Sequence, residues 1–459
     1  MANFTEPGVS ERDFLAEKHE LRTAVRRSYR AAVLWSAGNA LSSGMLLVYM
    51  IRALGASGFQ VSLLLSAPAL MGLLRLFTPS LVVRLGSAKR VCLLTSWTAY
   101  LLLAAVPLVL VAFSGRLESS AGRETLLVAL IALLCVHQLL EQIATVALWA
   151  WLGDFVPRRL RGRYFSRRNI LQLLVLLPLF PASGYAVDYL RQHVLTTPGL
   201  AHAAAIAVGT LLLMISLLPL VKMPVRRPGL SPSDHVGKSQ PSPAELLRQT
   251  LAPLRQRSSR RLLLYGCWFS LANGLFSTAQ NIFPKAVLGL ELTAMNLMQA
   301  TMRLGQVGVS SIAGPVSDRR GNRPVLVVCQ LLVGTAPLFY LAAVPQHPYL
   351  LYGAWILWSA YAGINICLPN LTMRLAPPGE HTAHLAAYQA LTSVFLTVGT
   401  LIGGWWFDRH VRSTWLVAGW SLDRYTLSFL LAWILRTAGA AIVATVPEAD
   451  VRRDRRAAR

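Results

Sequence analysis

Long apolar runs recur along the whole of this 459-residue chain, and each has about the length that a helix needs to cross a membrane. An α-helix rises about 1.5 Å per residue, so roughly 20 residues span a hydrocarbon core about 30 Å thick. Hydrophobic residues make up 54% of the chain and charged residues only 14%, whereas soluble domains carry roughly 25% charged residues. The sequence therefore predicts an all-α membrane protein that crosses the bilayer many times.

Twelve membrane spans are predicted from these runs, in two sets of six. They cover residues 31–51, 58–80, 91–113, 125–150, 170–190, 201–221, 262–285, 294–316, 324–344, 349–370, 384–406 and 425–446. A connection rich in Pro and Ser separates the two sets, as is typical of a linker. The predicted parts are an N-terminal segment (1–29), two six-helix bundles (30–221 and 262–446), the linker (222–261) and a basic tail (447–459).

Basic residues are distributed unevenly between the two sides of these spans. Of the 44 lysines and arginines, 33 lie on the side of the N-terminus. Cytoplasmic loops carry the excess of Lys and Arg, so both termini are predicted to be cytoplasmic and the protein to lie in the cytoplasmic (inner) membrane. Because the charge follows the membrane topology, the net charge of +24 does not indicate a nucleic-acid partner.

The two halves of the chain repeat each other in sequence. The matched pairs are Asn39 and Asn273 and Gly55 and Gly289 at an offset of 234, and Pro157 and Pro377, Gly184 and Gly404, and Asp188 and Asp408 at an offset of 220. Two repeats of equal topology place a cavity between them, around which the halves can rock. This organisation predicts transport by alternating access.

The loop between the eighth and ninth spans carries the most specific motif. Residues 314–323 read Gly-Pro-Val-Ser-Asp-Arg-Arg-Gly-Asn-Arg. In this motif, G-x-x-x-D-R-x-G-x-R, the chain resembles the major facilitator superfamily over about residues 30–446. The resemblance implies that superfamily's fold, twelve helices in two six-helix pseudo-repeats. It also implies a cytoplasmic gate that includes Gly314, Asp318, Arg319, Gly321 and Arg323. The matching loop of the first half has Val83 where the aspartate belongs.

A second stretch, residues 151–165, resembles the D-x-x-P-x-x-x-R-G segment between the fourth and fifth spans of many bacterial members. One interpretation is a gate in which Asp154 pairs with Arg161 or Arg163 when the cytoplasmic side closes. The other is that the arginines of this stretch only anchor the spans at the inner leaflet.

The fourth span contains the clearest functional candidates. A charge inside a span costs roughly 2.5 to 3.5 kcal/mol on insertion scales, so each such residue is a functional candidate by default. The spacing of His137, Glu141 and Thr145 puts them on one helix face near the middle of the span. Glu141 is the predicted proton-coupling residue, with His137 as a relay. The alternative is a fixed hydrogen-bonded pair that only fastens helices.

Other polar residues within the spans are candidates for the substrate cavity, because the resemblance implies that spans one, four, seven and ten line it. These candidates are Asn39, Gln138, Thr145, Asn273, Arg303, Trp358, Tyr361 and Asn365. Arg303 could pair with Glu141 across the halves, bind an anionic substrate, or form an ion pair within its own half. Arg75 and Arg436 also lie within spans, and the sequence assigns neither of them a role.

Enzymatic and ATP-driven activities have no support in the sequence. It contains no Walker-type phosphate loop, no HExxH motif and no credible Ser/His/Asp arrangement, and its five cysteines lack metal-ligand spacing. We therefore expect no metal and no cofactor. The predicted function is secondary transport of a small organic solute by a monomer in the lipid bilayer, coupled to H⁺ or Na⁺. The alternative is a non-transporting relative that serves as a membrane sensor or assembly partner.

Overall fold

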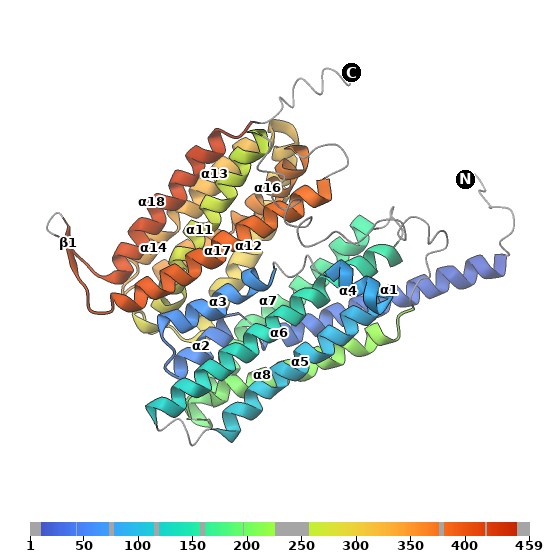
Figure 1. The fold of residues 1–459 in the computed structure, drawn as a ribbon, viewed down its shortest axis with the longest axis horizontal. Coiled ribbons are helices and arrows are strands. Elements are labelled where there is room, and N and C mark those ends of the chain that lie inside the picture. The colour runs from blue at the N-terminus through green and yellow to red at the C-terminus, as the bar shows by residue number, and fades with distance from the viewer. Residues whose placement is uncertain are drawn as a thin grey trace.

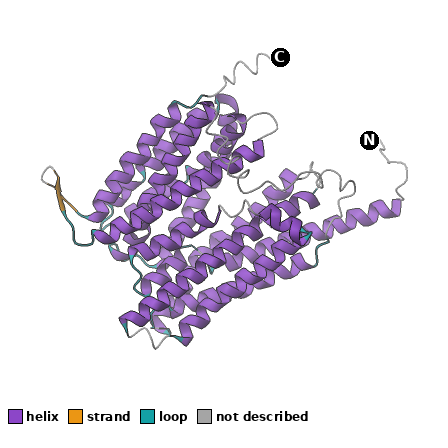
Figure 2. Cartoon of the chain, in the orientation of Figure 1, coloured by secondary structure: helices purple, strands orange, loops and turns teal. Residues whose placement is uncertain are grey.

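The structure, a computed structural model, describes residues 11–42, 44–72, 78–113, 119–156, 161–195, 197–224, 257–375, 381–417 and 420–447. Helices account for nearly all of this part of the chain (Figure 2). Most of the predicted linker and tail, together with Arg75, lie outside the described residues.

The helices of the first half follow the predicted spans, with two differences. They are α1 (Glu11–Ala40), α2 (Met45–Ala53), α3 (Gly58–Gly72), α4 (Thr78–Leu85), α5 (Ala88–Ala112), α6 (Ser120–Phe155), α7 (Arg161–His193) and α8 (Leu200–Val221). The first predicted span is divided between α1 and α2, with a turn at Leu41 and Ser42. The fifth begins earlier than predicted, because the basic residues after Arg161 are already helical.

The second half contains the remaining helices and a short hairpin. Its elements are α11 (Arg257–Ala286), α12 (Leu292–Arg320), α13 (Asn322–Thr335), α14 (Pro337–Ala342), η5 (Pro348–Leu350), α15 (Leu351–Trp358), α16 (Tyr361–Leu375), α17 (His381–Arg409), β1 (Trp415–Val417), β2 (Trp420–Leu422) and α18 (Arg424–Ala444). The antiparallel strands pair Trp415 with Leu422 and were not predicted. Helix α14 starts at Pro337, where a proline fits because the first helical position needs no N–H donor.

The chain is a multi-pass membrane protein. Ten helical segments in the described part are long and apolar enough to cross a bilayer, and a shorter apolar segment covers Gly58–Leu70. Helix α12 spans 29 residues but is not among the ten, because polar side chains such as Asn296 and Arg303 interrupt its apolar sequence. Together these helices form the twelve predicted spans.

The helices form two groups that correspond to the two halves (Figure 1). In the first group α5 packs on α6 and α1 on α8, and in the second α11 packs on α17 and α13 on α18. The groups are joined chiefly by two contacts, α3 with α17 and α7 with α12. Both lie toward the end of the molecule that is remote from the two chain termini.

Small residues allow the close approach of helices within each group. The backbones of Gly38 on α1 and Gly209 on α8 touch, and a Cβ atom added at Gly209 would lie 2.8 Å from the Gly38 carbonyl oxygen. In a membrane, helix association depends on such packing because the lipid is as apolar as the helix surfaces.

We predict that Gly209→Val destabilises the protein. The new side chain overlaps backbone that cannot move aside, and overpacking of this kind costs about 1–3 kcal/mol. Thermal unfolding in detergent should show a lower melting temperature than wild type. Gly308→Val is the matched control, because a side chain at that helical glycine meets open space. Equal melting temperatures of the two variants would contradict the packing argument.

Candidate functional site

One ring nitrogen of His137, Nδ1, is kept protonated by its hydrogen-bond partner. The side chain is buried against α5, and its Nδ1 atom lies 2.9 Å from the Ala99 carbonyl oxygen. A carbonyl oxygen only accepts hydrogen bonds, so Nδ1 carries a proton and donates it to Ala99. The other ring nitrogen, Nε2, is thereby left as the site that gains or loses a proton.

Glu141 faces this second nitrogen. Its Oε2 atom lies 3.6 Å from His137 Nε2, and its side chain is 20% exposed. With Nδ1 occupied, Nε2 and Oε2 are the two facing atoms of the pair between which a proton can pass. The distance exceeds a hydrogen bond, so a small rotation of Glu141 is needed to pass the proton.

Glu141 and Thr145 open into a pocket inside the first half, which we call the N-half pocket. Its volume is about 180 Å³. The lining residues come from five helices and are Ala31, Trp35, Cys92, Ser96, Tyr100, Glu141, Ala144, Thr145, Leu148, Trp149, Arg168, Gln172, Ser216, Leu217 and Leu220. The predicted coupling residue therefore faces the interior of its own half.

In the second half the structure brings together two of the predicted cavity residues. The Tyr361 hydroxyl on α16 donates to Asn273 Oδ1 on α11 over 2.9 Å, and Asn273 Nδ2 in turn donates to the Phe269 carbonyl oxygen. Trp358 is buried on α15, whereas Asn365 is exposed on α16. The aromatic stripe expected in the tenth span is therefore divided by the break between α15 and α16.

Arg303 and Glu141 are not paired in the part of the chain that the structure describes. Arg303 is exposed on α12 and donates to Gln306 Oε1 over 3.3 Å, and no carboxylate of a described residue lies within 4.0 Å of it. Asn39 on α1 and Gln138 on α6 are half-buried.

The predicted cytoplasmic gate is described only in part. The side chains of Asp154, Arg161 and Arg163 lie outside the described residues. The residues of the G-x-x-x-D-R-x-G-x-R motif cover the junction of α12 and α13; they are Gly314, Asp318, Arg319, Gly321 and Arg323. At that junction Gly321 adopts a φ of 96°, a conformation that favours glycine.

Arg436, to which the sequence assigned no role, lies in a buried polar cluster of the second half. Only 2% of its surface is exposed, and its Nη2 atom donates to Gln280 Oε1 over 3.1 Å. Tyr265 donates to Gln330 Oε1 over 2.6 Å, and Gln330 Nε2 donates to the Arg436 carbonyl oxygen over 2.7 Å. Hydrophobic periodicity gives no signal for such a cluster, because its members come from three different spans.

Two aspartates join the halves, and we call these contacts the inter-half seal. Asp188 on α7 accepts hydrogen bonds from the backbone N–H groups of Leu292 (3.3 Å) and Thr293 (2.8 Å), where α12 begins. The Thr293 hydroxyl also donates to it. The carboxylate thus satisfies N–H groups that have no partner within their own helix.

The second aspartate of the seal repeats this arrangement from the other half. Asp408 on α17 accepts from the N–H groups of Gly58 and Phe59, each over 2.7 Å, where α3 begins. The aspartates are the pair matched at an offset of 220, and the helix starts are matched at 234. The sequence repeat thus identified both carboxylates but not what they bind.

Glycines let the helices of the seal approach each other. A Cβ atom added at Gly184 would lie 2.7 Å from Thr293 Cα, and one added at Gly404 would collide with Ser62. Asn296 on α12 also donates to the Phe180 carbonyl oxygen of α7 over 2.9 Å.

An ion-paired carboxylate lies beside the seal. Glu291 contacts Arg191 of the first half at 2.7 Å and Lys285 of its own half at 3.0 Å. Partial burial by itself would raise the pKa of Glu291. The hydrogen bond and charge of Lys285, together with Arg191, outweigh it and hold the pKa below its ordinary value.

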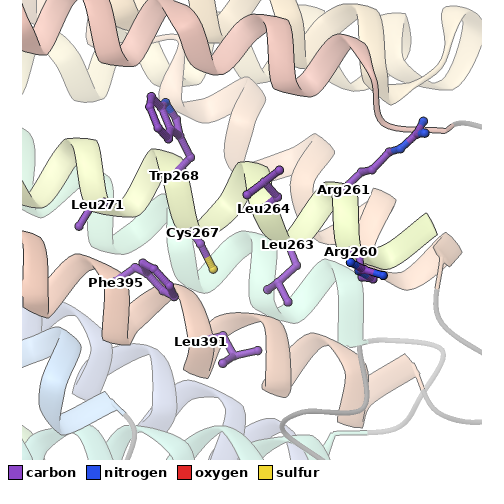
Figure 3. A pocket seen from close by; sticks show the side chains of 9 residues that line it. All are labelled: Arg260, Arg261, Leu263, Leu264, Cys267, Trp268, Leu271, Leu391 and Phe395. Carbon is purple, nitrogen blue, oxygen red and sulfur yellow. The ribbon is translucent and has the colours of Figure 1, made fainter. Parts of the chain in front are cut away.

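The second half has a larger cavity between α11 and α17 (Figure 3), with a volume of about 870 Å³. Leu263, Cys267, Leu391 and Phe395 point into it, and its wall is mainly apolar. Arg261 lines one end of the cavity and donates to the Thr445 carbonyl oxygen. The only ionisable groups that the walls provide, among the described residues, are therefore one thiol and the arginines at one end.

Comparison with known families gives one match. Residues 275–437 match the model of the Major Facilitator Superfamily. This region includes the motif at residues 314–323, on which the sequence resemblance rests. No curated protein sequence matches the chain.

Solved structures match over nearly the whole chain. The nucleoside transporter NupG is 14% identical with a TM-score of 0.58, and the match covers 94% of this chain and 100% of NupG. A D-xylose-proton symporter is 15% identical with a TM-score of 0.63, over 93% of this chain and 98% of the other. The inward-open xylose transporter XylE from E. coli is 12% identical, with a TM-score of 0.60 and coverages of 94% and 98%. At these identities the likeness concerns the fold alone.

We predict that Asp188→Asn and Asp408→Asn each loosen the seal. Hydrogen bonds to a charged group stabilise a structure by about 1.5–3 kcal/mol. Replacing the carboxylate by a neutral amide removes part of this, and a loss of about 1.4 kcal/mol shifts the equilibrium between the closed and open seal roughly ten-fold. Maleimide labelling of a Ser62→Cys reporter, buried in the seal, should therefore be roughly ten-fold faster in each variant. Labelling at position 62 is quantified by peptide mass spectrometry.

Asp423→Asn is the control for this experiment. Asp423 caps α18 through the N–H of Thr426, but both residues belong to the second half. Its loss should leave labelling at position 62 unchanged. If all three substitutions accelerated labelling equally, general destabilisation rather than opening of the seal would be the cause.

We also predict that the ion pair beside the seal weakens in acid. Because the pKa of Glu291 is lowered in the folded state, its stabilising effect is present above about pH 4.5 and is lost as the pH falls through the lowered value. Both partners are 36% exposed, so the effect should be at most about 1 kcal/mol. The melting temperatures of wild type and Glu291→Gln should differ at pH 7 and converge as the pH falls below 4.5 and through the lowered pKa. A difference that persists in acid would refute this.

Proposed function

We propose that this chain, a member of the major facilitator superfamily by its fold and by the match over residues 275–437, is a secondary transporter that moves a small organic solute by alternating access. The superfamily is one of transporters, not enzymes. We further propose that the transporter is proton-coupled and acts as a monomer in the cytoplasmic (inner) membrane.

The position of the seal supports an inward-facing arrangement. Asp188 and Asp408 join the halves at the end remote from the chain termini (Figure 1). The excess of Lys and Arg on the side of the termini supports a cytoplasmic location for that side. The seal then lies on the outer side, and transport requires that both aspartate contacts break and re-form as the halves rock.

The single observation that carries proton coupling is the geometry of His137 and Glu141. Because Ala99 accepts the Nδ1 proton, Nε2 and Oε2 are the facing atoms between which a proton can pass. Burial disfavours the charged form of such a group and polar partners favour it, so its affinity for a proton depends on what surrounds it. A change in its surroundings between two conformations can therefore take up or release a proton.

The competing interpretation is a fixed contact that only fastens α6 to α5. The separation of 3.6 Å argues against a tight fastening bond. The hydrogen bond of His137 to Ala99 already joins these helices, so Glu141 is not needed for that purpose.

We predict that Glu141→Gln abolishes solute-driven proton movement but spares solute exchange at a saturating solute concentration, because glutamine keeps the shape of the side chain and cannot titrate. Purified protein is reconstituted in liposomes loaded with a pH-sensitive dye and challenged with amino acids, sugars, nucleosides and carboxylates. Wild type should move protons with one of these classes.

Glu124→Gln is the matched control, because Glu124 is an exposed carboxylate near the start of the same helix. It should behave as wild type. If Glu141→Gln retained proton movement, the coupling role would be lost. If wild type moved neither protons nor solutes of any class, the transport function itself would be contradicted.

A further inference from the structure

The N-half pocket occupies a place that is filled in the second half. The repeat offsets map Ala31, Ser96 and Ser216, which line the pocket, onto Tyr265, Gln330 and Arg436. These three larger residues form the buried polar cluster of the second half, in which no more than 2% of each is exposed. The pocket therefore corresponds to three small residues in the first half at positions where the second half has large ones.

Arg168 gives the pocket a buried cation that has no carboxylate within 4.0 Å among the described residues. Only 7% of its surface is exposed, and its Nε atom has no hydrogen-bond acceptor in the described part of the chain. Its Nη1 atom makes only a long contact, 3.4 Å, with Gln172 Oε1, and its guanidinium lies 5.5 Å from the Trp149 ring centre. Burying a charge without a counter-ion costs several kcal/mol, so this arrangement favours an anionic ligand group.

Glu141 gives the same pocket an anion. Its carboxylate and the Arg168 guanidinium both line the pocket but are not within 4.0 Å of each other in the described structure. The two charges are thus available to a ligand rather than neutralised by each other. A simple anion would be repelled by the Glu141 carboxylate, and a simple cation by the Arg168 guanidinium. A neutral sugar would leave both charges without a counter-ion in the pocket.

We propose that the N-half pocket binds a small zwitterion of the amino-acid type, with its carboxylate at Arg168 and its ammonium at Glu141. Trp35 and Tyr100 supply an aromatic wall for a short apolar side chain. The volume of about 180 Å³ is roughly six times the 30 Å³ share of a water molecule and well below the roughly 300–1,000 Å³ of drug-sized sites. The pocket thus suits a solute of a few heavy atoms.

The ligand site adjoins the proposed proton-coupling pair. An ammonium group at Glu141 lies next to the carboxylate whose Oε2 atom faces His137 Nε2 at 3.6 Å, so the ligand and a proton on this pair interact electrostatically. Identifying the zwitterion as the transported solute rests on the proposed transport function. Binding itself does not.

The test is ligand-dependent thermal stabilisation of the purified full-length protein. The probes are glycine, L-alanine, L-serine and L-valine, with propionate and ethylamine as analogues of L-alanine that each lack one charge. At least one amino acid should stabilise the protein saturably. It should bind at least ten-fold more tightly than either analogue. Equal stabilisation by propionate would show an anion site, and no stabilisation by any amino acid would overturn the proposal.

Four variants show whether the ligand occupies this pocket. Arg168→Gln and Glu141→Gln should each weaken amino-acid binding at least ten-fold, whereas Arg167→Gln, at the exposed neighbouring position, should leave it unchanged. Ser96→Gln, which introduces the residue of the second half, should block binding while the unliganded protein melts at or above the wild-type temperature. Amino-acid binding that survives all of these substitutions would exclude the pocket.

The outcomes for binding and transport are separable. Amino-acid binding without solute or proton movement in liposomes would support the pocket and contradict transport. Proton movement driven by sugars or nucleosides, without amino-acid binding, would support transport and overturn the pocket proposal.

Discussion

The unpaired N–H groups at the start of a helix are the constraint on which the joining of the two halves depends. These N–H groups have no acceptor within their own helix, so a partner must come from a side chain or from water. At α3 and α12 the partner is a carboxylate of the opposite half, Asp408 or Asp188. The interaction is directional and charged, and it occurs twice. It therefore fixes where the halves meet while leaving the remainder of each half free to pivot.

The repeat explains why the two halves share a scaffold but differ inside. The positive φ angles of Gly55 and Gly289, matched at an offset of 234, show that the backbone follows the repeat closely. At the interior positions the side chains have diverged, as Ser96 and Gln330 illustrate. A shared backbone therefore carries a filled polar cluster in the second half and a charged pocket in the first. The proposed binding chemistry is confined to one half for this reason.

The sequence predicted the spans and the repeat well, because both depend on residue type along the chain. It did not predict the breaks within the first and tenth spans, since apolar residues resume after only a few small or polar ones. Arg168 was assigned to a loop because the apolar run starts at residue 170, yet α7 starts at Arg161 and carries Arg168 into the pocket. One of the three alternatives for Arg303, a pair with Glu141, depended on which way each side chain points, and linear spacing does not determine this.

Helix α7 connects the two features on which the proposed mechanism rests. Arg168 lines the pocket and Asp188 forms the seal, twenty residues or roughly 30 Å apart along one helix. Pro178 and Pro181 lie between them and remove two backbone hydrogen bonds, so the helix can bend there. A ligand bound to Arg168 thus acts on the same helix whose other end accepts hydrogen bonds from the first N–H groups of α12. Through this helix, a ligand in the N-half pocket can favour either the open or the closed state of the inter-half seal.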